Sequence, residues 1–324
     1  MKHKISSFMY KRMVKGLARV LDGGSVPMPD GREPIIADSD ADLNIIAWGD
    51  PQISALSPLR SARTYSACRD VEKAQGNFDA LILAGDVSEY GAWCEYRMAA
   101  KLINCIADKC GSIIAVTGNH DIRIRGYKKQ VKRFNDFLGL IKNGLQHGEE
   151  HYYFSHTING YKFIMLGADR NAFEASYISE KQLDWLDKEL SEAENGKPVF
   201  VINHQTLKNT NGLPESWMGM GSWRGTVGKQ SDRMKEIFER HSGIIFITGH
   251  LHYGISAFSY EDYGSYKALA LPTVGVLNHG KNSKLGQGYV ITVKGNEITA
   301  RGRCFCEGRY YSRETENSCI EIKC

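Results

Sequence analysis

The stretch that decides the fold is Leu81-Ile82-Leu83-Ala84-Gly85-Asp86-Val87-Ser88-Glu89. Its apolar run stops at a glycine and is followed at once by a carboxylate, which is typical of a buried strand that ends at a sheet edge. Four other apolar stretches are also followed by an acid, an amide or a histidine. They are Trp48-Gly49-Asp50, Thr117-Gly118-Asn119-His120, 199–204 and Thr248-Gly249-His250-Leu251-His252. One such residue is usually a turn residue or a helix cap. Five together predict a binding edge, because ligands of open α/β sheets lie beyond the carboxyl ends of the strands.

Around these endings, short apolar runs alternate with longer amphipathic runs. Strands are expected at 43–48, 80–84, 112–117, 198–203, 244–248, 289–293 and 297–303, and helices at 58–75, 92–109, 127–142, 180–190 and 232–241. Asn159-Gly160 predicts a tight hairpin turn between strands 151–156 and 161–166. Ser179 with Gln182 predicts a helix start. This alternation predicts an α/β protein with a largely parallel sheet.

The composition is that of a globular protein whose basic charge is concentrated at one end. The 324 residues include 41 Lys and Arg against 37 Asp and Glu, a formal net charge of +4. Residues 1–21 hold six basic and no acidic side chains, so the rest carries 35 basic and 37 acidic groups. A nearly neutral body offers no basic groove, which argues against a nucleic-acid partner.

The first 21 residues also place apolar side chains at helical spacing opposite the basic face, which predicts an amphipathic arm. We expect residues 1–42 to form this arm and a connector, and the main domain to begin at Leu43. The arm could contact an anionic membrane surface or another protein, or pack on the domain's own flank. No secretory signal or membrane span is recognised, and the eight cysteines include no C-x-x-C pair. We therefore expect a cytoplasmic protein with reduced thiols.

The order and spacing of the strand endings carry a family resemblance. Asp50-x-Gln52, Gly85-Asp86-x-x-Glu89, Gly118-Asn119-His120-Asp121, His204 and Gly249-His250-x-His252 resemble the calcineurin-like metallophosphoesterase superfamily over about residues 43–305. The resemblance implies a four-layer α/β/β/α sandwich of two mixed sheets flanked by helices, with the N-terminal helical arm outside it. It also implies a phosphoester hydrolase whose catalytic domain is 43–324 and whose centre holds two divalent metal ions.

The resemblance further implies which residues hold the ions. One ion would be bound by Asp50, Asp86 and His252, and the other by Asp86, Asn119, His204 and His250, with Asp86 as the bridge. Mixed oxygen and nitrogen ligands suit Mn²⁺, Fe or Zn²⁺ better than Ca²⁺, and among these Mn²⁺ or Fe is favoured, with Zn²⁺ as an alternative. A metal-bound hydroxide would then attack phosphorus between two ions about 3.5–4 Å apart.

Three residues beside these ligands carry separate expectations. By the same resemblance, His120 is the general acid for the leaving group and Glu89 is the carboxylate that orients it. The alternative for Glu89 is an acid that stabilises a helix start. Gln52 stands at a metal-ligand position where the commonest family pattern has His, and its amide oxygen is a weaker donor than imidazole nitrogen. This leaves open weaker metal binding, a preference for Mn²⁺ or Fe over Zn²⁺, or a site that fills only with substrate.

Substrate contacts are expected from the long loop 205–231 and from basic residues near the motifs. The candidates are Arg123, Arg170, Trp217, Trp223 and Arg224. Aromatic rings beside an Arg could stack a base and hold a second phosphate, or the tryptophans could pin the loop to the core. The favoured function is a phosphodiesterase acting on a nucleotide-like or small organic phosphoester. A nuclease and a non-catalytic metal-binding scaffold of the same fold are the alternatives.

Overall fold

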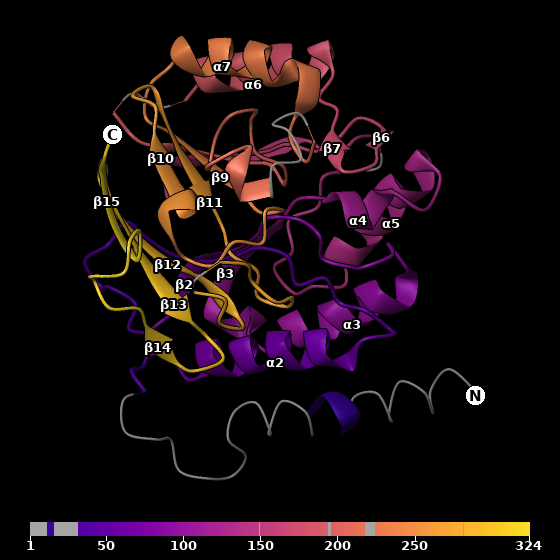
Figure 1. The fold of residues 1–324 in the computed structure, drawn as a ribbon, viewed down its shortest axis with the longest axis vertical. Helices are drawn as coiled ribbons and strands as arrows, with labels where there is room; N and C mark the ends of the chain where they lie inside the picture. The colour runs from indigo at the N-terminus through magenta and orange to yellow at the C-terminus, as the bar shows by residue number, and fades with distance from the viewer. Residues whose placement is uncertain (1–11, 16–31, 149, 194–195, 218–223, 281) are drawn as a thin grey trace.

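The computed structural model describes residues 12–15, 32–148, 150–193, 196–217, 224–280 and 282–324. Two mixed β-sheets lie face to face between layers of helices (Figure 1). In spatial order the first sheet consists of β14 (Arg309–Tyr310), β13 (Glu297–Cys304), β12 (Gln287–Lys294), β1 (Leu43–Trp48), β2 (Phe78–Leu83) and β3 (Cys110–Ala115), with β15 (Cys319–Lys323) paired to β13. The second consists of β10 (Tyr260–Asp262), β11 (Tyr266–Ala270), β9 (Ile244–Thr248), β8 (Val199–Ile202), β5 (Tyr161–Met165) and β4 (Phe154–Ile158).

Three apolar clusters fill the spaces between the layers. Alternate residues of a strand point to opposite faces. Ala47 of β1 therefore packs between the sheets, while its neighbour Trp48 packs under the helices. The first sheet is covered by α2 (Pro58–Glu72), α3 (Trp93–Ile103) and α5 (Tyr127–Leu138), and the second by α6 (Glu180–Ser191) and α7 (Ser231–Glu239). The expected four-layer sandwich of two mixed sheets is confirmed.

The predicted turn at Asn159-Gly160 and the predicted helix start at Ser179 are also present. Asn159 and Gly160 both have positive φ, 50° and 82°, as the tight turn between β4 and β5 requires. Ser179 accepts a hydrogen bond from the Gln182 backbone N–H at the start of α6. The sequence did not predict a small hairpin of β6 (Asn171–Ala172) and β7 (Ala175–Ser176), which packs near the short helix α4 (Asn119–Ile122).

The expected N-terminal arm is described only in part. Residues 12–15 are helical, and the remainder of 1–31 lies outside the described residues, so the amphipathic arm and the domain division stay predictions. Within the expected connector, Ile35 is fully buried and the Ala37 N–H donates to the Gln75 carbonyl oxygen at 2.9 Å. Across the described ranges, none of the helices has the length and apolar character needed to cross a bilayer.

Candidate metal centre

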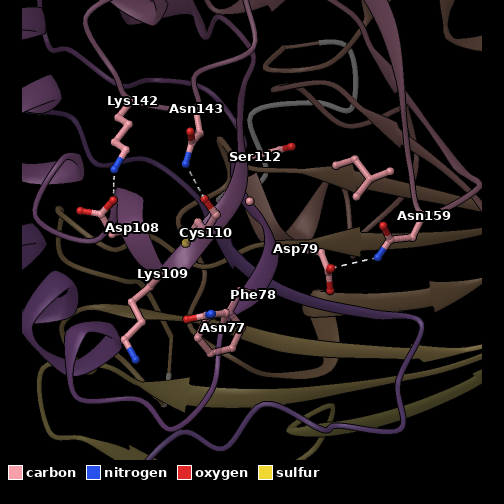
Figure 2. A pocket seen from close by; sticks show the side chains of 12 residues that line it. Asn77, Phe78, Asp79, Asp108, Lys109, Cys110, Ser112, Lys142, Asn143 and Asn159 are labelled. Atoms are coloured by element: carbon pink, nitrogen blue, oxygen red, sulfur yellow. Dashed lines mark hydrogen bonds and ion pairs between the residues drawn. The ribbon is translucent and has the colours of Figure 1, made fainter.

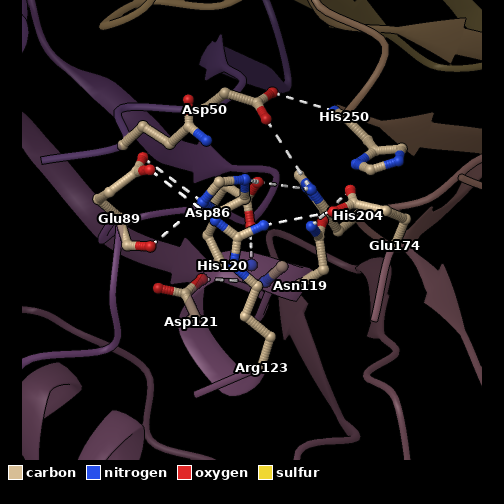
Figure 3. A network of polar contacts seen from close by, with 12 residues as sticks. Asp50, Asp86, Glu89, Asn119, His120, Asp121, Arg123, Glu174, His204 and His250 are labelled. Carbon is tan, nitrogen blue, oxygen red and sulfur yellow. Dashed lines mark hydrogen bonds and ion pairs between the residues drawn. The ribbon is translucent and has the colours of Figure 1, made fainter. Parts of the chain in front are cut away.

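The five strand endings that the sequence singled out meet at one place. Strands β1, β2 and β3 are mutually parallel in the first sheet, and β8 and β9 are parallel in the second. Their carboxyl ends therefore direct loops to a common edge, where the side chains converge (Figure 3). The residues brought together are Asp50, Asp86, Asn119, His120, His204, His250 and His252.

Asp86 lies at the centre of this cluster and is only 1% exposed. Its Oδ1 accepts a hydrogen bond from the His120 backbone N–H at 2.8 Å. Its Oδ2 lies 3.2 Å from His204 Nε2, yet neither of these two buried atoms makes a hydrogen bond. A buried carboxylate oxygen and a buried imidazole nitrogen that face each other in this way are suited to share a cation.

The ligand atoms fall into two overlapping groups. Asp86, His204 and His250 form one, and Asp50, Asp86 and His252 form the other, with ligand atoms in each group within 4.8 Å of one another. His204 Nδ1 lies 2.7 Å from the Ala84 carbonyl oxygen, so it carries a proton and leaves Nε2 as the ring nitrogen that faces the centre. Carboxylate oxygens and neutral imidazole nitrogens are the donors that divalent transition metals take. The residues therefore fit divalent metal binding, and Asp86 belongs to both groups.

The backbone of these loops is strained in a consistent way. Asp50, Asp86 and His250 have positive φ, at 50°, 47° and 71°, a region costly for residues other than glycine. Such strain persists only where the surrounding structure holds it, and it is common at functional sites. Gln52 also has positive φ and is 3% exposed, so it is buried in the turn directly after Asp50.

The motif glycines make room for these side chains. A Cβ on Gly85 would lie 2.5 Å from His204 Nδ1, and one on Gly118 would overlap Asp86 Oδ1. Gly85 also has a φ of 88°, which L-residues rarely adopt. The glycine in each motif is thus required by close approach between two loops from different strands.

The charges at the centre depend on one another. Burial disfavours the charged form of His204, but Asp86 and Asp50 outweigh it and raise the pKa of His204 to about 10. Burial likewise opposes ionisation of Asp86, but the His204 charge holds the pKa of Asp86 below its usual range. Burial and His204 together lower the pKa of His250. A divalent cation bound here would supply the positive charge that the His204 proton otherwise supplies.

His120 lies beside the centre and faces a carboxylate. Its Nδ1 is 3.4 Å from Glu89 Oε2 and 3.1 Å from the Glu89 carbonyl oxygen. Arg60 pairs with Glu89, and Arg123 Nη2 lies 3.8 Å from Glu89 Oε1. Burial lowers the pKa of His120, but Glu89 and Asp86 outweigh that effect and raise it. The contacts between Nδ1 and Glu89 therefore hold the His120 ring in one orientation, with its Nε2 edge toward the centre.

Asp121 ties two of the loops together. It is fully buried and accepts backbone N–H groups of Val87 at 3.1 Å, Ser88 at 2.9 Å and Gly118 at 2.9 Å. Burial and the nearby Asp86 charge raise the pKa of Asp121 to about 7. Asp121 thus fixes the loop after β2 against the loop after β3.

Sequence reasoning missed Glu174, which lies between β6 and β7. Its Oε2 accepts from Asn119 Nδ2 at 3.0 Å, and its Oε1 lies 3.3 Å from Arg123 Nη1 (Figure 3). Gln205 Nε2 donates to the Glu174 carbonyl oxygen at 3.4 Å. Glu174 follows no strong strand and belongs to no motif, so no sequence signal marks it.

The candidate substrate residues are more scattered. Arg123 lies at the centre, between Glu89 and Glu174. Arg170 is exposed and stacks over the Tyr177 ring, 3.8 Å from its centroid. Arg224 is exposed, and Trp217 belongs to the short helix η2 (Glu215–Trp217). Trp223 lies outside the described residues. Their roles stay predictions.

A hollow at the opposite edge of the first sheet lies apart from this centre. It is lined by the amino ends of β2 and β3, around Phe78 and Cys110 (Figure 2). Polar side chains that line it contact other residues of the same chain: Lys142 pairs with Asp108, and Asn159 Nδ2 donates to Asp79 at 2.9 Å. The hollow is therefore not part of the candidate centre.

Comparison with known proteins agrees with this geometry. The profile of the calcineurin-like phosphoesterase family matches residues 43–254. A probable cyclic nucleotide phosphodiesterase of Synechococcus sp. is 24% identical over 212 residues, which are 65% of this chain and 71% of the relative. A probable glycerophosphodiester phosphodiesterase of Arcobacter nitrofigilis is 23% identical over 146 residues, 44% of this chain and 48% of the relative.

Among solved structures, a purple acid phosphatase from yellow lupin seeds superposes with a TM-score of 0.60 at 12% identity. The match covers 87% of this chain and 53% of that chain, and it shows a likeness of fold. The family profile spans well over half of the sequence and includes all five strand endings. The chain therefore belongs to the calcineurin-like phosphoesterase family and is a phosphoester hydrolase.

Proposed function

We propose that the protein is a metal-dependent phosphodiesterase that acts on a nucleotide-like or small organic phosphodiester. The observation that carries this proposal is the buried Asp86 carboxylate, which belongs to both groups of metal-ligating side chains. The preference for diesters is supported by the relatives, which are named as cyclic nucleotide and glycerophosphodiester phosphodiesterases.

In this proposal, the ligands divide as the two groups suggest. Asp50, Asp86 and His252 would hold one ion, with Gln52 beside it, and Asp86, Asn119, His204 and His250 would hold the other. Two divalent ions supply positive charge for the phosphoryl oxygens and lower the pKa of water, so that a nucleophile is present at neutral pH. An amide oxygen from Gln52, in place of the imidazole of the commonest family pattern, would favour Mn²⁺ or Fe over Zn²⁺.

The general acid in the proposal is His120. Because its Nδ1 is directed at Glu89, its Nε2 is left for the leaving-group oxygen of the substrate. Nε2 is 3.9 Å from Asp86 Oδ2, so the proton is held beside the ligand that both ions share. Glu89 is in turn held by Arg60, which keeps the imidazole edge fixed while the alcohol departs.

The test is hydrolysis by protein loaded with Mn²⁺, Fe²⁺ or Zn²⁺ after chelation and dialysis. The panel contains bis-p-nitrophenyl phosphate, 3′,5′-cyclic nucleotides, a glycerophosphodiester and the monoester p-nitrophenyl phosphate. His120→Ala is expected to lower kcat by about 10²–10⁴-fold without loss of bound metal, the range for general acid catalysis. Asp86→Asn is expected to lose both metal and activity. The control is His156→Ala, an exposed histidine on β4.

Wild-type protein that binds two ions but hydrolyses none of these esters would overturn the proposal and favour a binding scaffold. Hydrolysis of the monoester alone would overturn the choice of diesters. Equal loss of activity in His120→Ala and His156→Ala would contradict the role assigned to His120.

A further inference from the structure

We propose that Glu174 is a positioning residue of the metal centre, which fixes the side-chain amide of Asn119 so that its oxygen is the atom offered to a divalent cation. This inference rests on the proposed function, because it assigns Asn119 to the ion held with His204 and His250. A carboxamide can bind a cation only through oxygen, so an Asn ligand needs a group that keeps its nitrogen turned away.

Glu174 settles the orientation of two neighbouring amides. A carboxylate can only accept hydrogen bonds, so the atom of Asn119 that lies 3.0 Å from Glu174 Oε2 must be Nδ2. The backbone carbonyl of Glu174 also only accepts, so the Gln205 atom 3.4 Å from it must be Nε2. The same Gln205 Nε2 lies 3.4 Å from Asn119 Oδ1, and this contact again requires oxygen at that position of Asn119. The three contacts agree, and two of them originate at Glu174.

The negative charge of Glu174 is balanced where it stands. Its second oxygen pairs with Arg123 Nη1 at 3.3 Å, and the other guanidinium nitrogen of Arg123 faces Glu89. Arg123 thus lies between the carboxylate that holds Asn119 and the carboxylate that holds His120. Because Arg60 also pairs with Glu89, the two carboxylates face two guanidinium groups, and Glu174 can accept from Asn119 without leaving an uncompensated charge.

The small hairpin of β6 and β7 places Glu174 against the centre. Asn171 Nδ2 donates to the Arg123 carbonyl oxygen at 2.7 Å, and the Ser176 N–H donates to the Thr226 carbonyl oxygen at 2.9 Å. Between these anchors, the turn at Phe173 has a φ of 59°. The hairpin is therefore tied on one side to the helix that carries Asn119, and on the other to the loop that follows His204.

The experiment measures Mn²⁺ binding to the full chain by equilibrium dialysis and by the electron paramagnetic resonance signal of free Mn²⁺. Wild type is expected to bind two ions. In Glu174→Ala one of the two sites is expected to weaken by about 10–100-fold, the usual effect of losing a residue that orients a ligand. Glu174→Gln keeps an acceptor oxygen for Asn119 and should retain most of the affinity. Glu180→Gln, an exposed acid at the start of α6, is the matched control.

A second background separates positioning from general charge effects. In Asn119→Asp the ligand is a carboxylate, which needs no amide orientation and is repelled by Glu174. Glu174→Ala should therefore leave metal affinity unchanged or higher in that background. The inference would be overturned if Glu174→Ala weakened Mn²⁺ binding equally in the wild-type and Asn119→Asp backgrounds. It would also be overturned if Glu174→Ala bound both ions with wild-type affinity. Fewer than two ions in wild type would instead overturn the dinuclear centre of the proposed function, and the inference with it.

Discussion

Asp121→Asn should destabilise the metal-free fold, because this carboxylate joins two loops that carry candidate ligands. Its Oδ2 accepts the N–H groups of Val87 and Gly118, and its Oδ1 accepts the Ser88 N–H and the Tyr96 hydroxyl at 3.1 Å. An asparagine has one acceptor oxygen, so its amide nitrogen must face two of these four donors. A hydrogen bond to a charged group contributes about 1.5–3 kcal/mol. Losing two predicts a cost of about 3–6 kcal/mol, a large share of a typical stability of about 5–15 kcal/mol.

The assay is equilibrium unfolding in urea with EDTA present, followed by tryptophan fluorescence and circular dichroism. EDTA removes any contribution from bound metal, and pH 8 keeps Asp121 largely ionised because its pKa is about 7. The matched control is Asp136→Asn on α5, which breaks an exposed i,i+4 pair with Lys132. The control should change stability by less than about 0.5 kcal/mol. Equal unfolding midpoints for Asp121→Asn and Asp136→Asn would refute the reasoning.

Three further predictions concern stability and metal affinity. Burial lowers the pKa of His147 from 6.5 to about 4, so between these pH values the unfolded chain binds a proton that the folded chain does not. The free energy of unfolding should therefore fall by about 3 kcal/mol as the pH drops from above 6.5 to 4. His147→Phe should reduce this pH dependence in urea titrations. Asp70→Ala should lower the free energy of unfolding by about 3–5 kcal/mol in the same assay, because the fully buried Arg303 loses its counter-ion. In the wild type, Arg303 donates to the two Asp70 carboxylate oxygens at 2.7 and 2.9 Å. A loss below about 1 kcal/mol would contradict this prediction. Gly118→Ala should weaken Mn²⁺ binding by about 10-fold or more, since its Cβ would displace Asp86, whereas Gly126→Ala, whose Cβ meets no atom within 4 Å, should bind as wild type does.

The parts of the fold and site that could be predicted are those encoded over a few neighbouring residues. An apolar run that stops at Gly85-Asp86 specifies a buried strand with a carboxylate just beyond its end, whatever the rest of the chain does. Asn159-Gly160 specifies a turn because both residues tolerate positive φ. Since parallel strands end at one edge, local patterns of this kind were sufficient to predict that the candidate ligand residues would meet.

What the sequence by itself determined was therefore the class of fold, the family and the set of side chains at the edge of the sheets. Only the tertiary structure decided how those side chains are held: Glu174 reaches Asn119 across 55 positions, and Arg303 reaches Asp70 across 233. Arg123, expected at the substrate, is paired with Glu89 and Glu174. The physical reason is that hydrogen bonds and ion pairs form over a few ångströms, and residues far apart in sequence reach such distances only when the packed sheets and the hairpin between β6 and β7 fix the backbone.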